Sequence, residues 1–157
     1  MQIFWKGIST SHDKGKSFDR LQEEIFESHS PNSVKVGHRA VEPYFFDNPW
    51  SLELAGKKVL VISPLSQTIR YQWKRIDKIW PEKKIFPNID LFVYQSVQSI
   101  GGLGPHKSWY ESLQIMKEDI SKIDFDVTLV SCGAYGLPLV NHIKNSLGRT
   151  AIYVGGA

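Results

Sequence analysis

The sequence predicts an α/β fold: a Rossmann-like, mostly parallel sheet with helices on both faces. From residue 57 onward, short apolar segments alternate strictly with segments of helical period. Residues 59–62 form a continuous apolar run between Gly56 and Ser63, which is typical of a strand buried on both faces. Because a strand, a helix and a further strand in this order make a right-handed crossover, the strands are expected to run parallel.

The same pattern places each element of the sheet. Four strands are expected at residues 59–62, 89–97, 127–130 and 151–154. Helical spacing of apolar side chains predicts three helices between them, at residues 66–80, 109–123 and 137–147. The first of these is expected to end at Pro81 and the last at Gly148, because proline and glycine terminate helices.

The N-terminal part of the sequence is less regular. Residues 1–40 are predicted to be an irregular segment with one short helix, in which Phe18, Leu21 and Ile25 lie at helical spacing. Residues 41–157 are predicted to be the Rossmann-like domain. It begins with an aromatic stretch at 41–50 whose two prolines favour an ordered loop packed on the core.

Length and composition exclude several classes of protein. The chain has 157 residues, 41% of them hydrophobic, which suits one domain with a core. No apolar run approaches the ~18 residues that a membrane span needs, so a cytoplasmic protein without a membrane span is expected. The single cysteine, Cys132, excludes an internal disulfide and a multi-thiolate zinc site.

The net charge of +3 is too small to indicate nucleic-acid binding. Residues 70–84 nevertheless contain six basic side chains and only two acidic ones. This pattern is typical of a solvated helix face followed by a charged loop. The alternative is a surface for an anionic partner, such as a phosphate or a polysaccharide.

Candidate binding residues follow the predicted strands, because open parallel sheets bind ligands at the carboxyl ends of their strands. The best candidate is the turn Cys132-Gly133-Ala134-Tyr135-Gly136, where glycines let backbone N–H groups approach a phosphate at the start of a helix. Its glycine spacing matches neither the dinucleotide fingerprint nor the Walker loop, so a purely structural turn is the alternative. Cys132 itself is interpreted as a small buried residue rather than a thiolate nucleophile.

Carboxylates are the other group that a metal-dependent sugar-nucleotide enzyme needs, because they hold the divalent ion. Asp124 and Asp126 precede a predicted strand, which places them at the wrong end of the sheet for an active site. Glu42 and Asp47 lie in the aromatic loop. They are candidate metal ligands or bases, or hydrogen-bond partners that fix the loop.

Several segments between residues 40 and 157 carry a family resemblance. They include Glu42-Pro43-Tyr44-Phe45-Phe46, Leu54-Ala55-Gly56-Lys57-Lys58, Val97-Gln98-Ser99-Ile100-Gly101-Gly102, the turn at 132–136 and Gly155-Gly156-Ala157. In these segments the chain resembles bacterial proteins encoded among surface-polysaccharide genes. Those proteins are in turn similar to glycosyltransferases of the GT-D fold.

The resemblance implies a Rossmann-like domain that transfers a sugar from a nucleotide-sugar donor in surface-polysaccharide biosynthesis. It also implies Mn²⁺ or Mg²⁺ held by an acidic motif in a glycine-rich N-terminal segment. Residues 1–39 contain no Gly-Arg-Phe-Gly run, which leaves Glu42 as the candidate catalytic base. The implied rim of the nucleotide-sugar pocket consists of Ser63, Gln98, Ser99, Gly101, Gly133, Tyr135, Gly136, Gly155 and Gly156.

Other interpretations stay open. A non-catalytic remnant or interaction module would keep the fold without the acidic motif. A Rossmann-type oxidoreductase needs an acidic residue after its second strand, where Ser96 and Gln98 stand instead. Because the sequence ends just after Gly155-Gly156, where a further loop and helix are expected, a shortened fold or one completed by a partner is a further expectation. A homo-oligomer is one form that such a partner would take.

Overall fold

The computed structural model describes residues 3–6 and 18–155 and divides the chain into two compact units, Met1–Phe46 and Asp47–Ala157. In the first unit, strands β1 (Ile3–Lys6) and β2 (Val34–Gly37) pair in parallel. Between them lies helix α1 (Phe18–His29), which confirms the short helix expected here. Neither strand is expected from the sequence pattern of residues 1–40, which indicates an irregular segment with one helix. The 3-10 turns η1 (His38–Val41) and η2 (Pro43–Phe45) follow β2.

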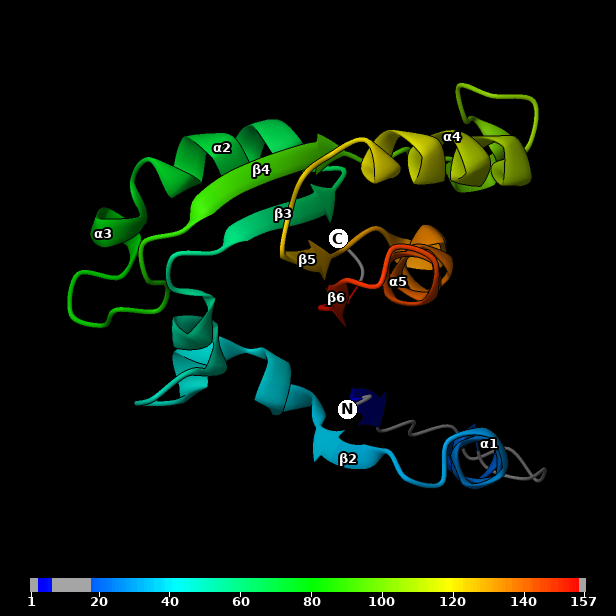
Figure 1. Cartoon of the computed structure of the whole chain (residues 1–157), viewed down its shortest axis with the longest axis horizontal. Helices are drawn as coiled ribbons and strands as arrows, with labels where there is room; N and C mark the ends of the chain where they lie inside the picture. The colour runs from blue at the N-terminus through cyan, green and yellow to red at the C-terminus, as the bar shows by residue number, and fades with distance from the viewer. Residues whose placement is uncertain (1–2, 7–17, 156–157) are drawn as a thin grey trace. The chain divides into compact units, whose positions relative to one another are not determined.

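The second unit is built on a four-stranded parallel sheet, which confirms the predicted α/β fold (Figure 1). Its strands are β3 (Lys58–Ser63), β4 (Asp90–Gln95), β5 (Val127–Val130) and β6 (Thr150–Tyr153). They lie in the order β4-β3-β5-β6, with Val59 opposite Leu91 on one side and opposite Val127 on the other.

The remaining elements of this unit connect or precede the strands. The α-helices are α2 (Ser66–Trp73), α3 (Ile76–Ile79), α4 (Trp109–Ser121) and α5 (Gly136–Asn145). The 3-10 turns are η3 (Trp50–Leu54), η4 (Ile100–Gly102) and η5 (Gly133–Tyr135).

Both faces of the sheet are covered. Tyr94 of β4 donates a hydrogen bond to Asp119 of α4, whereas the next residue, Gln95, accepts one from Ser66 of α2. Successive strand residues point to opposite faces, so α2 and α4 lie on opposite sides of the sheet. The larger core cluster joins Leu60 and Ile62 of β3 to α4 and α5, and the smaller one joins Val59 to η3.

One predicted helix is divided in two. The expected helix at 66–80 is present as α2 and α3, separated by a turn at Lys74 and Arg75. The break follows Trp73, whose ring packs edge-on against Phe86 with 5.8 Å between ring centroids. The apolar period correctly marks Ile69, Trp73 and Ile76 as half-buried side chains, whereas Trp80 is exposed.

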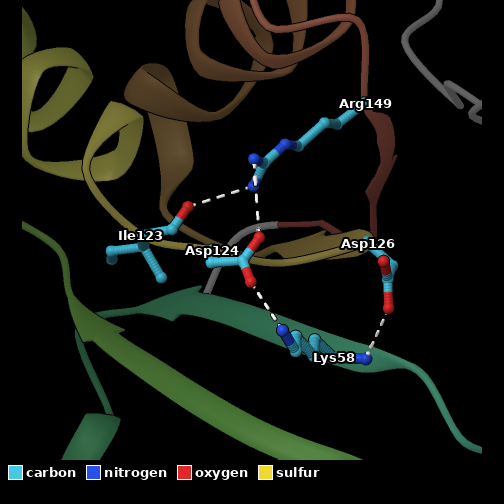
Figure 2. A network of polar contacts seen from close by, with 5 residues as sticks. All are labelled: Lys58, Ile123, Asp124, Asp126 and Arg149. Atoms are coloured by element: carbon cyan, nitrogen blue, oxygen red, sulfur yellow. Dashed lines mark hydrogen bonds and ion pairs between the residues drawn. The ribbon is translucent and has the colours of Figure 1, made fainter.

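Charged side chains tie the strands together at the amino ends of β3, β5 and β6 (Figure 2). The Asp126 carboxylate accepts a hydrogen bond of 2.8 Å from the backbone N–H of Lys58. Asp124 pairs with Lys58 Nζ at 2.5 Å and with Arg149 at 3.7 Å. Arg149 also donates to the Ile123 carbonyl and covers the Phe125 ring. Both aspartates therefore lie at the amino edge, as predicted, and link neighbouring strands.

The pairing of Asp124 predicts a pH-dependent stability. The hydrogen bond and charge of Lys58, followed by the charge of Arg149, lower the pKa of the Asp124 carboxyl. As pH falls, Asp124 is therefore protonated in the unfolded state before it is protonated in the folded state. The stabilisation that its charge gives the folded state is fully present above the unfolded pKa of about 4. It is lost as pH falls through the lower folded-state pKa. Urea unfolding of Asp124→Asn should show lower stability than the unmodified chain at pH 7, and the difference should vanish in acid.

The matched control for this experiment is Glu118→Gln, which removes an exposed carboxylate that has no ion pair among residues 3–6 and 18–155. Its effect on stability should be small at every pH. An Asp124→Asn deficit that stays constant from neutral pH into acid would contradict the role of this charge.

Candidate functional site

The carboxyl edge of the four-stranded sheet contains a topological switch point. The chain runs from β3 outward to β4, then crosses to β5 on the other side of β3 and continues to β6. The loops after β3 and β5 therefore diverge, which is where open α/β sheets bind ligands. Ser96 N–H donates to the Ser63 carbonyl, and Ser131 N–H donates to the Ile62 carbonyl, so the starts of three loops lie side by side.

Two of the predicted binding segments meet through one hydrogen bond. The hydroxyls of Ser99 and Tyr135 are 2.7 Å apart, which joins the loop after β4 to the turn after β5. The Tyr135 ring is buried and stacks on Trp109, with centroids 5.1 Å apart and planes within 10°. Trp109 is the first residue of α4, the helix that follows the loop after β4. The ring stack therefore holds the turn after β5 against the start of α4.

The glycines of the turn have different physical roles. Gly133 has a φ of +56°, a left-handed conformation that favours glycine. At Gly136 a Cβ atom would overlap Cε2 of the Tyr153 ring, so this glycine allows the ring to pack against α5. Gly136 is buried, whereas Gly133 and Ala134 are exposed. The accessible backbone of the turn is therefore its first half.

The other predicted rim residues differ in exposure. Ser63 is 2% exposed, and its hydroxyl accepts a hydrogen bond from the Leu65 N–H, which shapes the loop after β3. Gln98 and Gly101 are exposed on the loop after β4. Gly155, half-buried with a φ of +117°, follows β6, and Gly156 lies outside the described residues.

Two polar residues at this edge, Gln95 and Ser96, are not among the pocket residues expected from the sequence. Gln95 donates to the Pro64 carbonyl at 2.7 Å and accepts from the Ser66 hydroxyl. It also lines a shallow hollow of about 410 Å³ with Pro64, Leu65, Gln67 and Thr68. The Ser96 hydroxyl is buried and has no hydrogen-bond partner among the described residues. Both residues could have been proposed from the sequence, because they stand at the carboxyl end of the predicted second strand, where parallel sheets bind ligands.

The candidate base lies in the other compact unit. Glu42 precedes η2 and hydrogen-bonds to Tyr44, whose phenol pKa is raised by burial and by the charge and hydrogen bond of Glu42. Asp47 pairs with Lys83 at 3.6 Å. Each carboxylate thus has a local partner, which matches the loop-fixing alternative and leaves the role of Glu42 in catalysis a prediction.

The donor set at the carboxyl edge does not fit the divalent metal that the resemblance implies. Residues 63–69, 96–106 and 131–138 contain hydroxyls, amides and backbone N–H groups but no Asp or Glu. Mg²⁺ and Mn²⁺ are held through carboxylate and other oxygen ligands. Within residues 3–6 and 18–155, no three His, Cys, Asp or Glu side chains gather in a way that could hold a metal ion.

Comparison of the sequence with models of known protein families assigns the chain to a family. The family model described as a GT-D fold-like domain matches residues 6–157. The chain belongs to this family. No curated protein and no solved structure matches it. Among the residues that the structure describes, no helix of this GT-D fold-like domain is both long and apolar enough to cross a membrane.

The lone cysteine of this GT-D fold-like domain is not an activated thiolate. Cys132 is 6% exposed, and burial raises its thiol pKa to about 11. At neutral pH the side chain is therefore a neutral thiol that packs with Tyr135 and Leu139 in the larger core cluster. This burial agrees with its interpretation as a small core residue.

Alkylation of Cys132 should therefore be slow in the folded domain. At pH 8 the native thiol should react with iodoacetamide at least ~100-fold more slowly than the same thiol in guanidinium, because it is buried and protonated. Mass spectrometry follows the single modification. Equal rates in the native and denatured states would contradict the buried position.

Gly136→Ala should destabilise the domain by about 1–3 kcal/mol, the usual cost of overpacking, because its Cβ would overlap the Tyr153 ring. Urea unfolding measures the loss. Tyr153→Ala opens the space, so Gly136→Ala should cost much less in that background. Equal costs in the two backgrounds would place the strain elsewhere.

Proposed function

We propose that this chain is a glycosyltransferase-like domain that binds a nucleotide sugar at the carboxyl edge of its parallel sheet. The observation that carries the proposal is the hydrogen bond between Ser99 and Tyr135. It brings together the two loops that the family resemblance implies as the pocket rim, at the switch point where such sheets bind ligands. Membership of the GT-D fold-like family supports the same class of ligand.

The diphosphate is proposed to bind at the exposed backbone of Gly133 and Ala134, beside the start of α5. No side chain caps this helix, but its Gly136 N–H donates to the Gly133 carbonyl and Pro138 has no N–H. The donors proposed for the anion are therefore the backbone N–H groups of Gly133 and Ala134. The positive end of the helix dipole offsets part of the diphosphate charge. Gln98 is proposed to contact the sugar, because its exposed amide can both donate and accept hydrogen bonds.

Transfer would form a bond between an acceptor hydroxyl oxygen and the anomeric carbon while the bond from that carbon to the diphosphate breaks. A base accepts the hydroxyl proton, and Glu42 is our candidate. The absence of any carboxylate from the three carboxyl-edge loops favours a second candidate function, a binding module that holds the nucleotide sugar without transferring it.

Thermal unfolding against nucleoside diphosphates and their glucose conjugates tests binding. A ligand at ~100 times its dissociation constant adds about 2.7 kcal/mol, which should raise Tm by about 4 °C or more. Tyr135→Phe, which removes the hydroxyl that bonds to Ser99, should weaken the shift at least threefold. Tyr71→Phe on α2 is the matched control and should leave the shift unchanged.

Two outcomes would count against this function. If no nucleotide ligand moves a cooperative melt, the domain does not bind a nucleotide sugar. If Tyr135→Phe and Tyr71→Phe respond alike, the ligand binds elsewhere. Release of nucleoside diphosphate separates the two candidate functions: a transferase should release it and lose at least ~100-fold activity with Glu42→Gln, whereas a binding module should show the thermal shift alone.

A further inference from the structure

The outer surface of α2 and α3 carries polar and aromatic side chains that the proposed function does not use. Tyr71 lies in α2, Lys74 and Arg75 form the turn that follows it, and Lys78 lies in α3; all four are exposed. We call these four residues the basic stripe. Between them Trp73 is half-buried against Phe86, whereas the stripe side chains are exposed to solvent.

The stripe concentrates positive charge. Arg75 lies 5.1 Å from the centroid of the Tyr71 ring and donates a hydrogen bond to its hydroxyl. Lys74 and Lys78 have no ion-pair partner among residues 3–6 and 18–155. Residues 70–84 contain six basic and two acidic side chains, so this segment accounts for the whole positive excess of a chain with a net charge of +3.

Apolar side chains are exposed beside these cations. Ile79 is 43% exposed and Trp80 is 38% exposed, and Tyr71 within the stripe is 59% exposed. Tyr and Trp favour the boundary between water and lipid, where the ring contacts apolar groups and its polar atom stays hydrated. A row of cations next to exposed aromatic and aliphatic side chains is typical of helices that lie on a bilayer surface.

We propose that the basic stripe, with Ile79 and Trp80, docks the domain on an anionic lipid surface. The three cations interact with acidic headgroups, and the exposed apolar side chains enter the boundary between headgroups and acyl chains. A soluble polyanion, such as a nucleic acid, would interact with the cations but would gain little from an exposed Ile79. This interaction lies on the surface and requires no membrane span.

Vesicle cosedimentation tests the proposal with the full chain. The chain should bind vesicles that contain phosphatidylglycerol and not vesicles of phosphatidylcholine alone, and added salt should weaken binding. Each basic residue near an anionic surface contributes about fivefold in affinity, so Lys74→Gln/Arg75→Gln/Lys78→Gln should bind roughly 100-fold more weakly. Circular dichroism and a melt check that this variant is folded.

The control variant removes the same charge elsewhere. Lys57→Gln/Lys107→Gln/Lys122→Gln changes three exposed lysines outside the stripe and should lower binding by no more than a few-fold. Failure of the chain to bind anionic vesicles would overturn the proposal. So would equal losses in the two triple variants.

A second substitution separates a lipid surface from a soluble polyanion. Ile79→Ser keeps every charge and should weaken vesicle binding several-fold while leaving any binding of a single-stranded oligonucleotide unchanged. If the oligonucleotide binds as tightly as the vesicles do and Ile79→Ser changes neither, the stripe is a polyanion site and the lipid proposal is wrong.

Discussion

The burial of β3 on both faces and along both edges is the constraint on which the rest of the domain depends. Val59, Leu60 and Ile62 are fully buried, and β4 and β5 pair with the two edges of the strand. A strand in this position is apolar along its length, so its polar side chains, Lys58 and Ser63, stand at its two ends. The sheet therefore has two chemically distinct edges.

The amino edge stabilises the sheet, whereas the carboxyl edge is the proposed binding site. The amino edge holds Asp124 and Asp126 with their cationic and backbone partners, which fasten three strands to one another. The carboxyl edge has hydroxyls, amides and open backbone instead. A charged ligand at that edge would meet no competing carboxylate, and the Ser99 to Tyr135 contact holds its two main loops together.

The proposed lipid surface belongs to a third region, the exposed side of α2 and α3. It uses side chains that contribute little to the core, so it can carry positive charge without weakening the fold. The end of this segment, α3, lies beside the start of β4 and therefore toward the amino ends of the strands (Figure 1). Binding at the two places still relies on different residues, Tyr135 in one and Lys74 to Lys78 in the other.

The sequence by itself determined the parallel α/β fold, the alternation of its strands and helices, and the positions of Asp124 and Asp126 at the amino edge, because these depend on local periodicity. The break between α2 and α3 and the β1–β2 pairing could not be predicted, since each depends on partners distant in the sequence. Only the tertiary structure decided that Gly136 is required by the Tyr153 ring and that Ser99 meets Tyr135. Such contacts form only when the crossover connections bring loops distant in the sequence to the same edge of the sheet. The local pattern of apolar and polar residues therefore cannot predict them.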